Sequence, residues 1–295
     1  MTIVHSLSVD VEGFCEGSAE SCCVPPEMIR SRRERDEIAA NVDEILEFFD
    51  QYGVKATFFT LGVIGAEQPG VVRRIATAGH EIASHSYDHL RLFNLSDERA
   101  RDQVVRSKHV LEDASGGPVY GFRAPEFSVC RKNEFLLEVI RDTGYRYDSS
   151  IYPISYHDVY GIKGARRDIH MVRAGLVECP PSTLQVFGRT LPVLGGGYLR
   201  LFPMALNMVA LHLYERKREP AMIYIHPYEL GSIYPRLSGM TRARRLRRYG
   251  NLRQVRPRFE KLFRHYAFGR VIDVLRQQGY DLEHPIGAES LMIRP

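Results

Sequence analysis

The chain has 295 residues, of which 44% are hydrophobic and 26% are charged. This composition is ordinary for a globular protein and supplies a full core, so extensive disorder, collagen-like repeats and a small disulfide scaffold are excluded. The 40 basic and 36 acidic residues give a formal net charge of +4. No run approaches the roughly 20 apolar residues that span a bilayer, and the first residues show no secretory signal, so we expect a soluble protein.

Short β-type runs alternate with longer helical patterns along most of the chain. The β-type runs cover 3–9, 54–61, 80–84, 119–122, the surroundings of Tyr147, and 221–225. The helical patterns cover 36–52, 67–78, 97–114, 131–143, 204–217 and 255–278. This alternation predicts a mainly parallel sheet. Residues 149–200 interrupt this alternation, and we expect extra strands there at 176–179 and 183–193. We expect this segment to be an insertion over one end of a barrel. The whole chain, 1–295, would then be a single domain.

The C-terminal region is strongly basic. Residues 236–264 contain eleven basic residues and one acid, Glu260, which gives this segment a charge of +10 and leaves −6 on the rest of the chain. An anionic polymer, a phospholipid surface and a pyrophosphate-linked substrate are candidate partners. A solvated helical face is the favoured interpretation, because a run of charges alone is a weak motif. We expect 236–295 to be a basic helical extension packed on the domain.

The cysteines are Cys15, Cys22, Cys23, Cys130 and Cys179. Their odd number and the lack of a C-x-x-C spacing argue against a disulfide framework and against a thiolate zinc site. Reduced thiols are the default interpretation and predict a cytoplasmic location. Nothing in the sequence supports a redox role for the vicinal pair at 22–23.

Polar residues suited to catalysis follow the first and third predicted strands. The first strand ends in Asp10 and Glu12, and carboxylates at i and i+2 lie on one face of a strand, so both can point into one pocket. The third strand is followed by His85 and His89, which share a face if the loop turns helically. Two histidines and one carboxylate, with an open position for water, form the usual catalytic zinc arrangement.

Three later strand ends add Arg123, Asp148 and His226. Taken singly, the arginine could form a structural ion pair, the aspartate could lie in a turn, and the histidine could be buried in the core. Functional groups of an α/β barrel lie where the loops after the strands converge. Five polar strand ends in a fixed order therefore favour one shared site.

The ordered motifs D-x-E, H-S-x-x-H, R-x-P, D-S-S and I-x-H resemble those of the NodB-type polysaccharide deacetylases, carbohydrate esterase family four. The flanking K-A-T-F-F at 55–59 and A-G-H-E-I at 78–82 resemble the same family, over about residues 3–227. The resemblance implies an α/β fold, a distorted (β/α)7-8 TIM-like barrel with inserted strands and C-terminal helices. The chain is most similar to the cytosolic subgroup associated with exopolysaccharide and exosortase clusters, through H-D-V-Y-G at 157–161, G-G-G-Y-L-R at 195–200 and H-P-Y-E-L at 226–230.

The sequence departs from the family pattern in three places. Adjacent aspartates are usual in the first motif, whereas here Val11 stands second and Glu12 follows, so we expect Glu12 to replace the missing ligand with a one-residue shift. Glu126 and Phe127 stand where an aromatic residue and a glycine are usual after R-x-P, which predicts a different substrate contour. Ile225 replaces a leucine, a conservative change.

The resemblance implies a hydrolase of linear amide bonds that removes N-acetyl groups from an amino sugar, in a polysaccharide or in an oligosaccharide or lipid-linked precursor. Glu12, His85 and His89 would hold a divalent ion, with zinc as the first expectation. The ion would polarise the acetyl carbonyl and lower the pKa of the attacking water. Asp10 would be the general base, and His226 would protonate the departing amine.

The same resemblance implies supporting roles for two charged residues. Arg123 would orient the base and keep it ionised, and Asp148 would orient His226 and keep it protonated, because a neighbouring opposite charge favours the charged form. The backbone N–H of Glu126 would help to stabilise the tetrahedral oxyanion.

His157, Tyr160 and Arg200 are candidate substrate contacts in the inserted region. For the segment that contains Arg200, the alternative is equally favoured: the three glycines form a tight turn, and the arginine only packs around it.

Other functions stay open at this point. An allantoinase-like or cyclic-imide amidohydrolase would share the D-x-E and two-histidine pattern, although the expected Asp148–His226 pair favours the deacetylase. The displaced second acid encourages a third hypothesis, a catalytically inactive carbohydrate-binding homologue. Nucleic acid is not an expected partner, because no recognisable motif accompanies the basic tail. A peripheral membrane contact through the basic C-terminal region and a homo-oligomer are further expectations that the sequence does not decide.

Overall fold

The computed structural model describes residues 2–19, 24–154 and 161–282. Its main sheet has nine strands in the order β10-β1-β2-β3-β4-β5-β7-β6, with β11 also paired to β1. The strands of this sheet are β1 (Val4–Val11), β2 (Thr57–Thr60), β3 (Glu81–Ser84), β4 (Gly121–Phe122), β5 (Tyr147–Asp148), β6 (His170–Arg173), β7 (Leu176–Glu178), β10 (Met222–Ile225) and β11 (Ala267–Gly269). All of its pairings are parallel except that of β6 with β7. A separate hairpin joins β8 (Thr183–Val186) and β9 (Arg189–Pro192).

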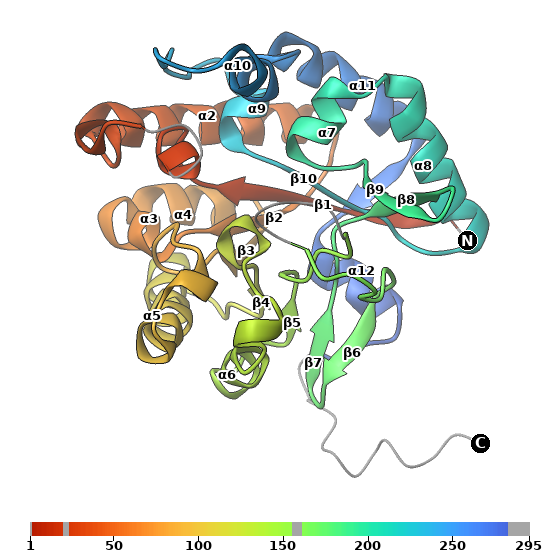
Figure 1. The fold of residues 1–295 in the computed structure, drawn as a ribbon, viewed down its shortest axis with the longest axis horizontal. Coiled ribbons are helices and arrows are strands. Elements are labelled where there is room, and N and C mark those ends of the chain that lie inside the picture. Colours follow the sequence, from red (N-terminus) through yellow and green to blue (C-terminus); the bar gives the residue numbers. More distant parts are fainter. Residues whose placement is uncertain (1, 20–23, 155–160, 283–295) are drawn as a thin grey trace.

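Most helices lie outside the curled sheet, with α2, α9, α10 and α11 above β1 in the view of Figure 1 and α3, α4 and α5 below it. The helices are α2 (Arg32–Gln51), α3 (Gly62–Glu67), α4 (Pro69–Thr77), α5 (Asp97–Ser115), α6 (Leu136–Asp142), α7 (Gly196–Leu201), α8 (Met204–Lys217), α9 (Pro227–Leu230), α10 (Arg242–Tyr249), α11 (Val255–His265) and α12 (Val271–Gln277). Helix α5 shows how sequence sets such bounds, because the Ser96 hydroxyl accepts from the N–H of Arg99 and Gly116 ends the helix in a left-handed conformation.

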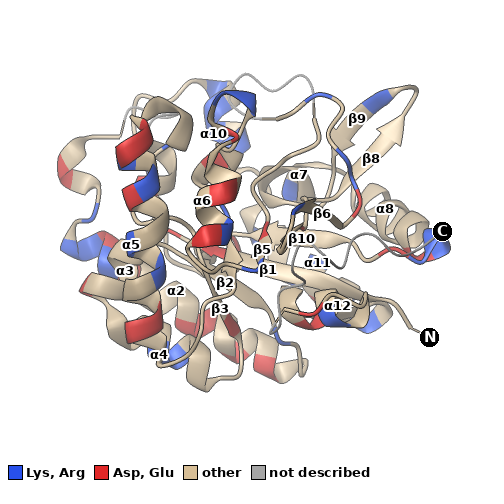
Figure 2. Cartoon of the chain, turned by 90° about the horizontal axis from the view of Figure 1, so that it is seen from below, with Lys and Arg blue, Asp and Glu red and all other residues tan. Residues whose placement is uncertain are grey.

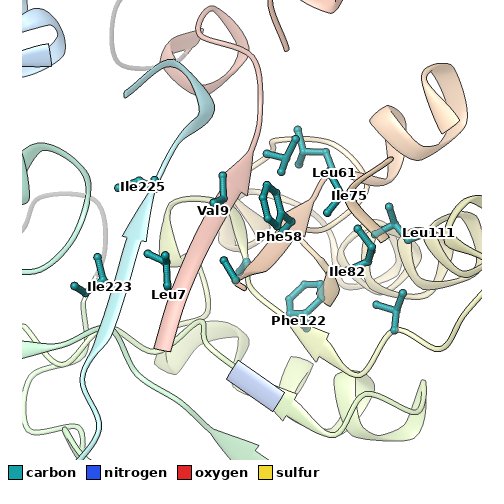
Figure 3. Close-up of a cluster of buried hydrophobic side chains, with 14 of the residues drawn as sticks. Leu7, Val9, Phe58, Leu61, Ile75, Ile82, Leu111, Phe122, Ile223 and Ile225 are labelled. Atoms are coloured by element: carbon teal, nitrogen blue, oxygen red, sulfur yellow. The ribbon is translucent and has the colours of Figure 1, made fainter. Parts of the chain in front are cut away.

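The two faces of β1 have different chemistry. Leu7 and Val9 point outward into the main hydrophobic cluster between the sheet and the helices. Figure 3 shows part of this cluster, with side chains of five neighbouring strands beside Ile75 and Leu111 from the surrounding helices. Ser8 and Asp10 alternate with the apolar residues and face the inside of the curled sheet, where both contact Arg123. The inside of the barrel is therefore polar toward the carboxyl ends of its strands.

The other end of the barrel interior is closed by α12. Its buried Val271 and Leu275 pack in one cluster with Phe59, Tyr147 and Met222, which point inward from the strands. The helix begins there, because its first N–H groups donate to polar side chains of β2 and β3. The C-terminal region is thus part of the barrel core, and its strand β11 extends the sheet beside the start of β1.

The predicted fold class is confirmed: the chain is α/β, with a curled and mostly parallel sheet, as expected for a distorted (β/α)-barrel. Among the described strands no ladder joins β6 to β10, so the barrel is open on that side. None of the helices in the described ranges combines the length and the hydropathy that crossing a bilayer requires.

Several predicted elements were wrong in detail. The helix expected at 67–78 is α4, which begins at Pro69 because proline fits the first position of a helix but not its interior. Glu67 instead ends the separate short helix α3. The helix expected at 255–278 is interrupted by β11. Strand β6 and helices α3, α7 and α9 were not predicted, whereas α10 lies within the segment expected to be a basic helical extension.

Candidate active site

The parallel strands bring most of the predicted site residues to one edge of the sheet. Asp10 and Glu12 lie at the end of β1, His85 and His89 after β3, Arg123 after β4, Asp148 at the end of β5, and His226 after β10. Six of these seven residues form two groups of charged contacts, and a hydrogen bond from His85 to the carbonyl of Arg123 joins the two groups. The exception is Asp148, which contacts other partners.

Glu12 and the two histidines of the second motif form a buried cluster. Glu12 Oε2 lies 2.6 Å from His89 Nε2 and 3.6 Å from His85 Nε2. One donor atom from each of the three residues can be chosen so that all three lie within 4.8 Å of one another. Two imidazoles and one carboxylate are a sufficient protein ligand set for a catalytic zinc ion and leave a fourth position open.

The loop that carries the histidines is not the helical turn that the spacing suggested. Residues 87–89 form bends, and Ser86 adopts a left-handed conformation with φ of 68°. The carbonyls of Ser86 and Tyr87 accept from the N–H groups that begin α3, which fixes the loop against that helix. The rings converge on Glu12 because tertiary hydrogen bonds hold the loop, and not because of a helical period.

Hydrogen bonding and charge both fit a bound cation at this cluster. The Nδ1 of His85 lies 2.8 Å from the carbonyl of Arg123, which can only accept, so Nδ1 carries the proton and Nε2 keeps its lone pair. Burial disfavours charge on His89, but the Glu12 carboxylate outweighs burial and raises the pKa of His89 to about 9. The cluster therefore attracts positive charge at the point where a divalent ion would be held.

The chain after β1 folds tightly over Glu12. An added Cβ at Gly17 would lie 1.9 Å from Glu12 Oε1, so only glycine allows this close approach. Arg30 ties the loop down, with ion pairs to Glu16 at 2.7 Å and to Asp88 at 2.5 Å. This packing fixes the position of the Glu12 carboxylate and was not visible in the sequence.

Asp10 makes the contact expected of it with Arg123. The fully buried guanidinium donates from Nη1 to Asp10 Oδ1 at 2.6 Å and to Ser8 Oγ at 2.9 Å, and from Nη2 to Ser149 Oγ at 2.9 Å. It also lies 4.0 Å from the ring centre of Phe59. The arginine is locked in place and presents its charge to Asp10.

The partner of His226 is Glu229 and not Asp148, which corrects the expected pairing. The Glu229 carboxylate accepts from His226 Nδ1 at 2.8 Å and from the backbone N–H of His226 at 2.9 Å. Burial favours the neutral acid, but Arg200 and His226 lower the pKa of Glu229 to about 2. In turn, Glu12 and Glu229 outweigh burial and raise the pKa of His226. The other ring nitrogen of His226 lies 3.7 Å from Glu12 Oε1, at the metal cluster.

Arg200 was predicted as a substrate contact, but it forms an ion pair with the Glu229 oxygen that does not bond His226. It is buried and donates from Nε to Glu229 Oε1 at 2.5 Å. Its Nη1 and Nη2 donate to the carbonyls of Gly250 and Arg247, each at 2.7 Å. Each of the three guanidinium nitrogens therefore has a protein partner, and the buried side chain acts as a support for Glu229.

Asp148 pairs with a second buried acid, and within the described residues it forms no hydrogen bond or ion pair with His226. Its neighbour across the β5–β7 ladder is Glu178, and both side chains are fully buried. The Ser150 hydroxyl donates to Asp148, and the Ile151 N–H donates to Glu178. Burial raises the pKa of Asp148 to about 6 and that of Glu178 further, so the pair holds a proton.

The remaining predicted substrate contacts have different outcomes. The Glu126 side chain is paired with Arg91 at 2.8 Å, and its backbone is left-handed with φ of 48°. Within the described residues the N–H of Glu126 makes no hydrogen bond, so it is available to a ligand. His157 and Tyr160 lie outside the described residues.

Sequence reasoning missed Glu229 and Glu178. A signal for the first was present, since proline and then glutamate follow His226 at the start of α9. Glutamate at the third helical position commonly bonds back to the residue that caps the helix. No local signal pointed to Glu178, because its partner lies on another strand.

Two protein families match adjacent parts of the chain. Residues 36–147 match the family "Polysaccharide deacetylase", and residues 149–276 match a domain of unknown function, DUF3473. Over 73 residues the chain is 37% identical to a peptidoglycan-N-acetylglucosamine deacetylase of Bacillus cereus, which covers 25% of this chain and 26% of that protein. The matched segment thus spans about a quarter of that relative's length.

Two solved structures share the fold over nearly the whole chain. One is a Mycobacterium smegmatis protein assigned as a polysaccharide deacetylase, with a TM-score of 0.63 at 20% identity, covering 95% of this chain and 92% of that one. The other is the PuuE allantoinase, with a TM-score of 0.64 at 16% identity, covering 97% of this chain and 92% of that one. Likeness at this identity concerns the fold alone, so the chemistry has to be argued from the site.

Proposed function

We propose that the protein is a metal-dependent hydrolase that removes N-acetyl groups from an amino sugar of a saccharide, releasing acetate and a free amine. The observation that carries this proposal is the buried Glu12–His85–His89 cluster, with an ion-paired carboxylate and a carboxylate-supported histidine beside it. The deacetylase family match and the name of the Bacillus cereus relative support the substrate class.

Glu12, His85 and His89 would hold the metal, and we propose zinc because two imidazoles and a carboxylate suit it. When bound, zinc supplies a Lewis acid that polarises the acetyl carbonyl and makes water a better nucleophile. The buried position of all three ligands keeps competing water out of the cluster.

Asp10 is the proposed general base. It lies two residues before a proposed ligand on the same face of β1, and its carboxylate is held by Arg123 at 2.6 Å. In this role it accepts a proton from the attacking water as the C–O bond forms. The guanidinium fixes the carboxylate geometry and leaves its other oxygen for the water. The free N–H of Glu126 is the proposed donor to the oxyanion that develops on the acetyl oxygen.

His226 is the proposed general acid. An amide nitrogen cannot leave as a bare anion, so it must receive a proton as its bond to the carbonyl carbon breaks. Nε2 of His226 faces the metal cluster, while Nδ1 is held by Glu229. Glu229 stabilises the imidazolium that gives up this proton and fixes the ring, and Arg200 keeps Glu229 ionised. The catalytic acid is thus supported by a carboxylate–arginine pair.

The proposal also covers the molecule that carries the amino sugar, the process it belongs to and the cellular location. We propose an amino sugar within a polysaccharide or a lipid-linked precursor, in exopolysaccharide synthesis like that of the exosortase-associated subgroup, in the cytoplasm. The described cysteines are free thiols, which fits a reducing compartment.

The test combines metal analysis with amine release from N-acetylglucosamine oligomers. Zinc-loaded wild type should hold about one ion and release amine; Glu12→Ala should lose the ion; Asp10→Asn should keep it and release nothing. Turnover of allantoin or a cyclic imide in place of the sugar would move the function to the amidohydrolases. A wild type that binds no zinc would contradict the metal site and favour the carbohydrate-binding homologue.

A further inference from the structure

A cavity of about 540 Å³ lies between α10 and the segments on either side of it. Its wall contains Tyr234, Arg236, Arg245, Tyr249, Asn251 and Arg253. The volume is enough for one or two sugar rings. The proposed catalytic residues do not line it, so it is a separate feature of the surface.

The cavity is electropositive. Arg236, Arg245 and Arg253 are exposed, and no acidic side chain in the described ranges forms an ion pair with any of them. Figure 2 marks the Lys and Arg positions in blue and shows them gathered on α10, whose sequence is R-A-R-R-L-R-R-Y. Glu260 is the one acid in the whole segment 236–264. Guanidinium groups with free forks bind carboxylates and phosphates in preference to neutral groups.

An aromatic cluster joins the cavity to the proposed active site. The buried Leu237 and Leu252 at its floor pack in one cluster with Phe14 and Tyr228, which lie two residues after Glu12 and two after His226. The ring of Tyr249 lies 5.3 Å from that of Phe14, and the ring of Tyr228 stacks on that of His226 at 5.5 Å. One packed layer therefore borders both the cavity and the proposed general acid.

The cavity wall is held rigidly. The Tyr249 hydroxyl accepts from the Leu237 N–H at 2.8 Å and donates to the Pro235 carbonyl at 2.9 Å. Arg200, which supports the proposed acid through Glu229, also donates to the Gly250 carbonyl, and Asn251 donates back to the Arg200 carbonyl at 3.1 Å. A preformed wall binds a ligand with a smaller loss of conformational entropy than a flexible one does.

We propose that this cavity binds an acidic sugar unit of the saccharide whose N-acetyl group is removed at the neighbouring site. The shared chemistry is an anion on a sugar ring, either a carboxylate or a phosphate, with the arginines binding the anion and the tyrosines packing against the ring. This inference rests on the proposed function, since it places the acidic unit next to the acetylated one. A continuous chain of contacts to His226 and a concave wall favour a saccharide over a flat nucleic-acid or membrane contact.

Binding to the zinc-loaded protein, measured by calorimetry, tests the proposal independently of turnover. The probes are hyaluronan tetrasaccharide for a carboxylate, UDP-N-acetylglucosamine for a phosphate, and neutral chitotetraose. At least one acidic probe should bind about tenfold more tightly than chitotetraose, which corresponds to 1.4 kcal/mol. The preferred probe identifies the anion. The double variant Arg245→Gln/Arg253→Gln should remove this preference and leave chitotetraose binding within about twofold.

The matched control is Arg242→Gln/Arg244→Gln, which removes the same amount of charge at two exposed positions of α10 that do not line the cavity. This control should keep the preference. An equal loss in both double variants would show a diffuse charge effect and overturn the proposal, as would equal binding of acidic and neutral probes to wild type. Tighter binding of duplex DNA or phosphatidylglycerol vesicles, weakened equally by both pairs, would also overturn it.

Binding and amine release together distinguish a failure of the proposed subsite from a failure of the proposed reaction. Amine release from chitotetraose without an acidic preference would leave the proposed function standing and remove the subsite. A preference that depends on Arg245 and Arg253, without amine release from any N-acetylated probe, would support the subsite and contradict the proposed reaction.

Discussion

Glu229→Gln tests how the proposed general acid is supported. The carboxylate accepts from His226 Nδ1 and N–H through one oxygen, and from Arg200 through the other at 2.5 Å. Glutamine keeps the volume but carries no charge. Its NH2 group must face the donors of either His226 or Arg200. The substitution therefore removes the anion that stabilises the imidazolium while leaving the metal ligands in place.

The size of the effect follows from the bond that is lost. A hydrogen bond to a charged group contributes about 1.5–3 kcal/mol, which corresponds to about 10- to 150-fold in rate. General acid catalysis as a whole contributes about 10²–10⁴-fold, and this sets the upper limit. We expect kcat/KM for an N-acetylated oligosaccharide to fall about 10- to 100-fold in Glu229→Gln, with zinc content unchanged.

The decisive assay compares two leaving groups. The amine of an N-acetyl sugar must be protonated to leave, whereas the phenolate of 4-methylumbelliferyl acetate leaves without a proton. Glu229→Gln should therefore lose activity on the amide and keep activity on the activated ester within about threefold. Asp148→Asn is the control, because Asp148 was the partner expected from the sequence and is held by Glu178 instead. It should change both substrates by the same factor.

Two results would refute this reasoning. One is an equal loss on amide and ester in Glu229→Gln, which would indicate a general structural defect. The other is selective loss on the amide in Asp148→Asn. Because unpairing the buried Arg200 is expected to cost about 3–5 kcal/mol of stability, thermal unfolding is measured alongside. Should Glu229→Gln fail to fold, Arg200→Lys keeps the charge and should give a smaller loss with the same selectivity for the amide.

Two further predictions concern the metal and the pH dependence of stability. Gly17→Ala should bind zinc about 10- to 100-fold more weakly, because its Cβ would displace the Glu12 carboxylate. Zinc titration checks this, and an affinity equal to that of Gly117→Ala, whose Cβ meets nothing within 4 Å, would contradict it. Burial lowers the pKa of His80 from 6.5 to about 4, so its contribution to stability is complete above pH 6.5 and is lost as the pH falls toward 4, by at most about 3 kcal/mol. His80→Gln should flatten this acid limb in urea unfolding, and the exposed His212→Gln should not; equal limbs in both variants would count against the assignment.

Strands such as β1 were predictable because their side chains alternate between apolar and polar with a period of two. The same period decides which side chains face each side of the sheet. Leu7 and Val9 face the helices and Ser8 and Asp10 face inward, as the two-residue period requires. The strand β11 was not predictable, because it has three residues and pairs with a segment more than 250 residues earlier. A helical pattern on both sides of it concealed the interruption.

The site was predictable where a residue's position follows from its strand, and not where it follows from a partner. Glu12, His85 and His89 converge because parallel strands end at one edge, so the motif order was enough to group them. The partners of Asp148 and Arg200 depend on which elements pack across the barrel mouth. Between Asp148 and His226 the described residues form five strands and two helices, and no local pattern reports how those elements fold back.

Electrostatics explains why the predicted pairing of Asp148 with His226 gave way to Glu229. A buried histidine that must carry a proton needs a partner that stays ionised out of water. Asp148 meets this condition less well, because burial raises its pKa to about 6 and its partner is a second buried acid, Glu178, whose pKa is raised further. Glu229 does meet it, because Arg200 lowers its pKa to about 2 despite full burial. A sequence motif can place a carboxylate near a histidine, but the nearest buried cation decides which carboxylate carries the charge.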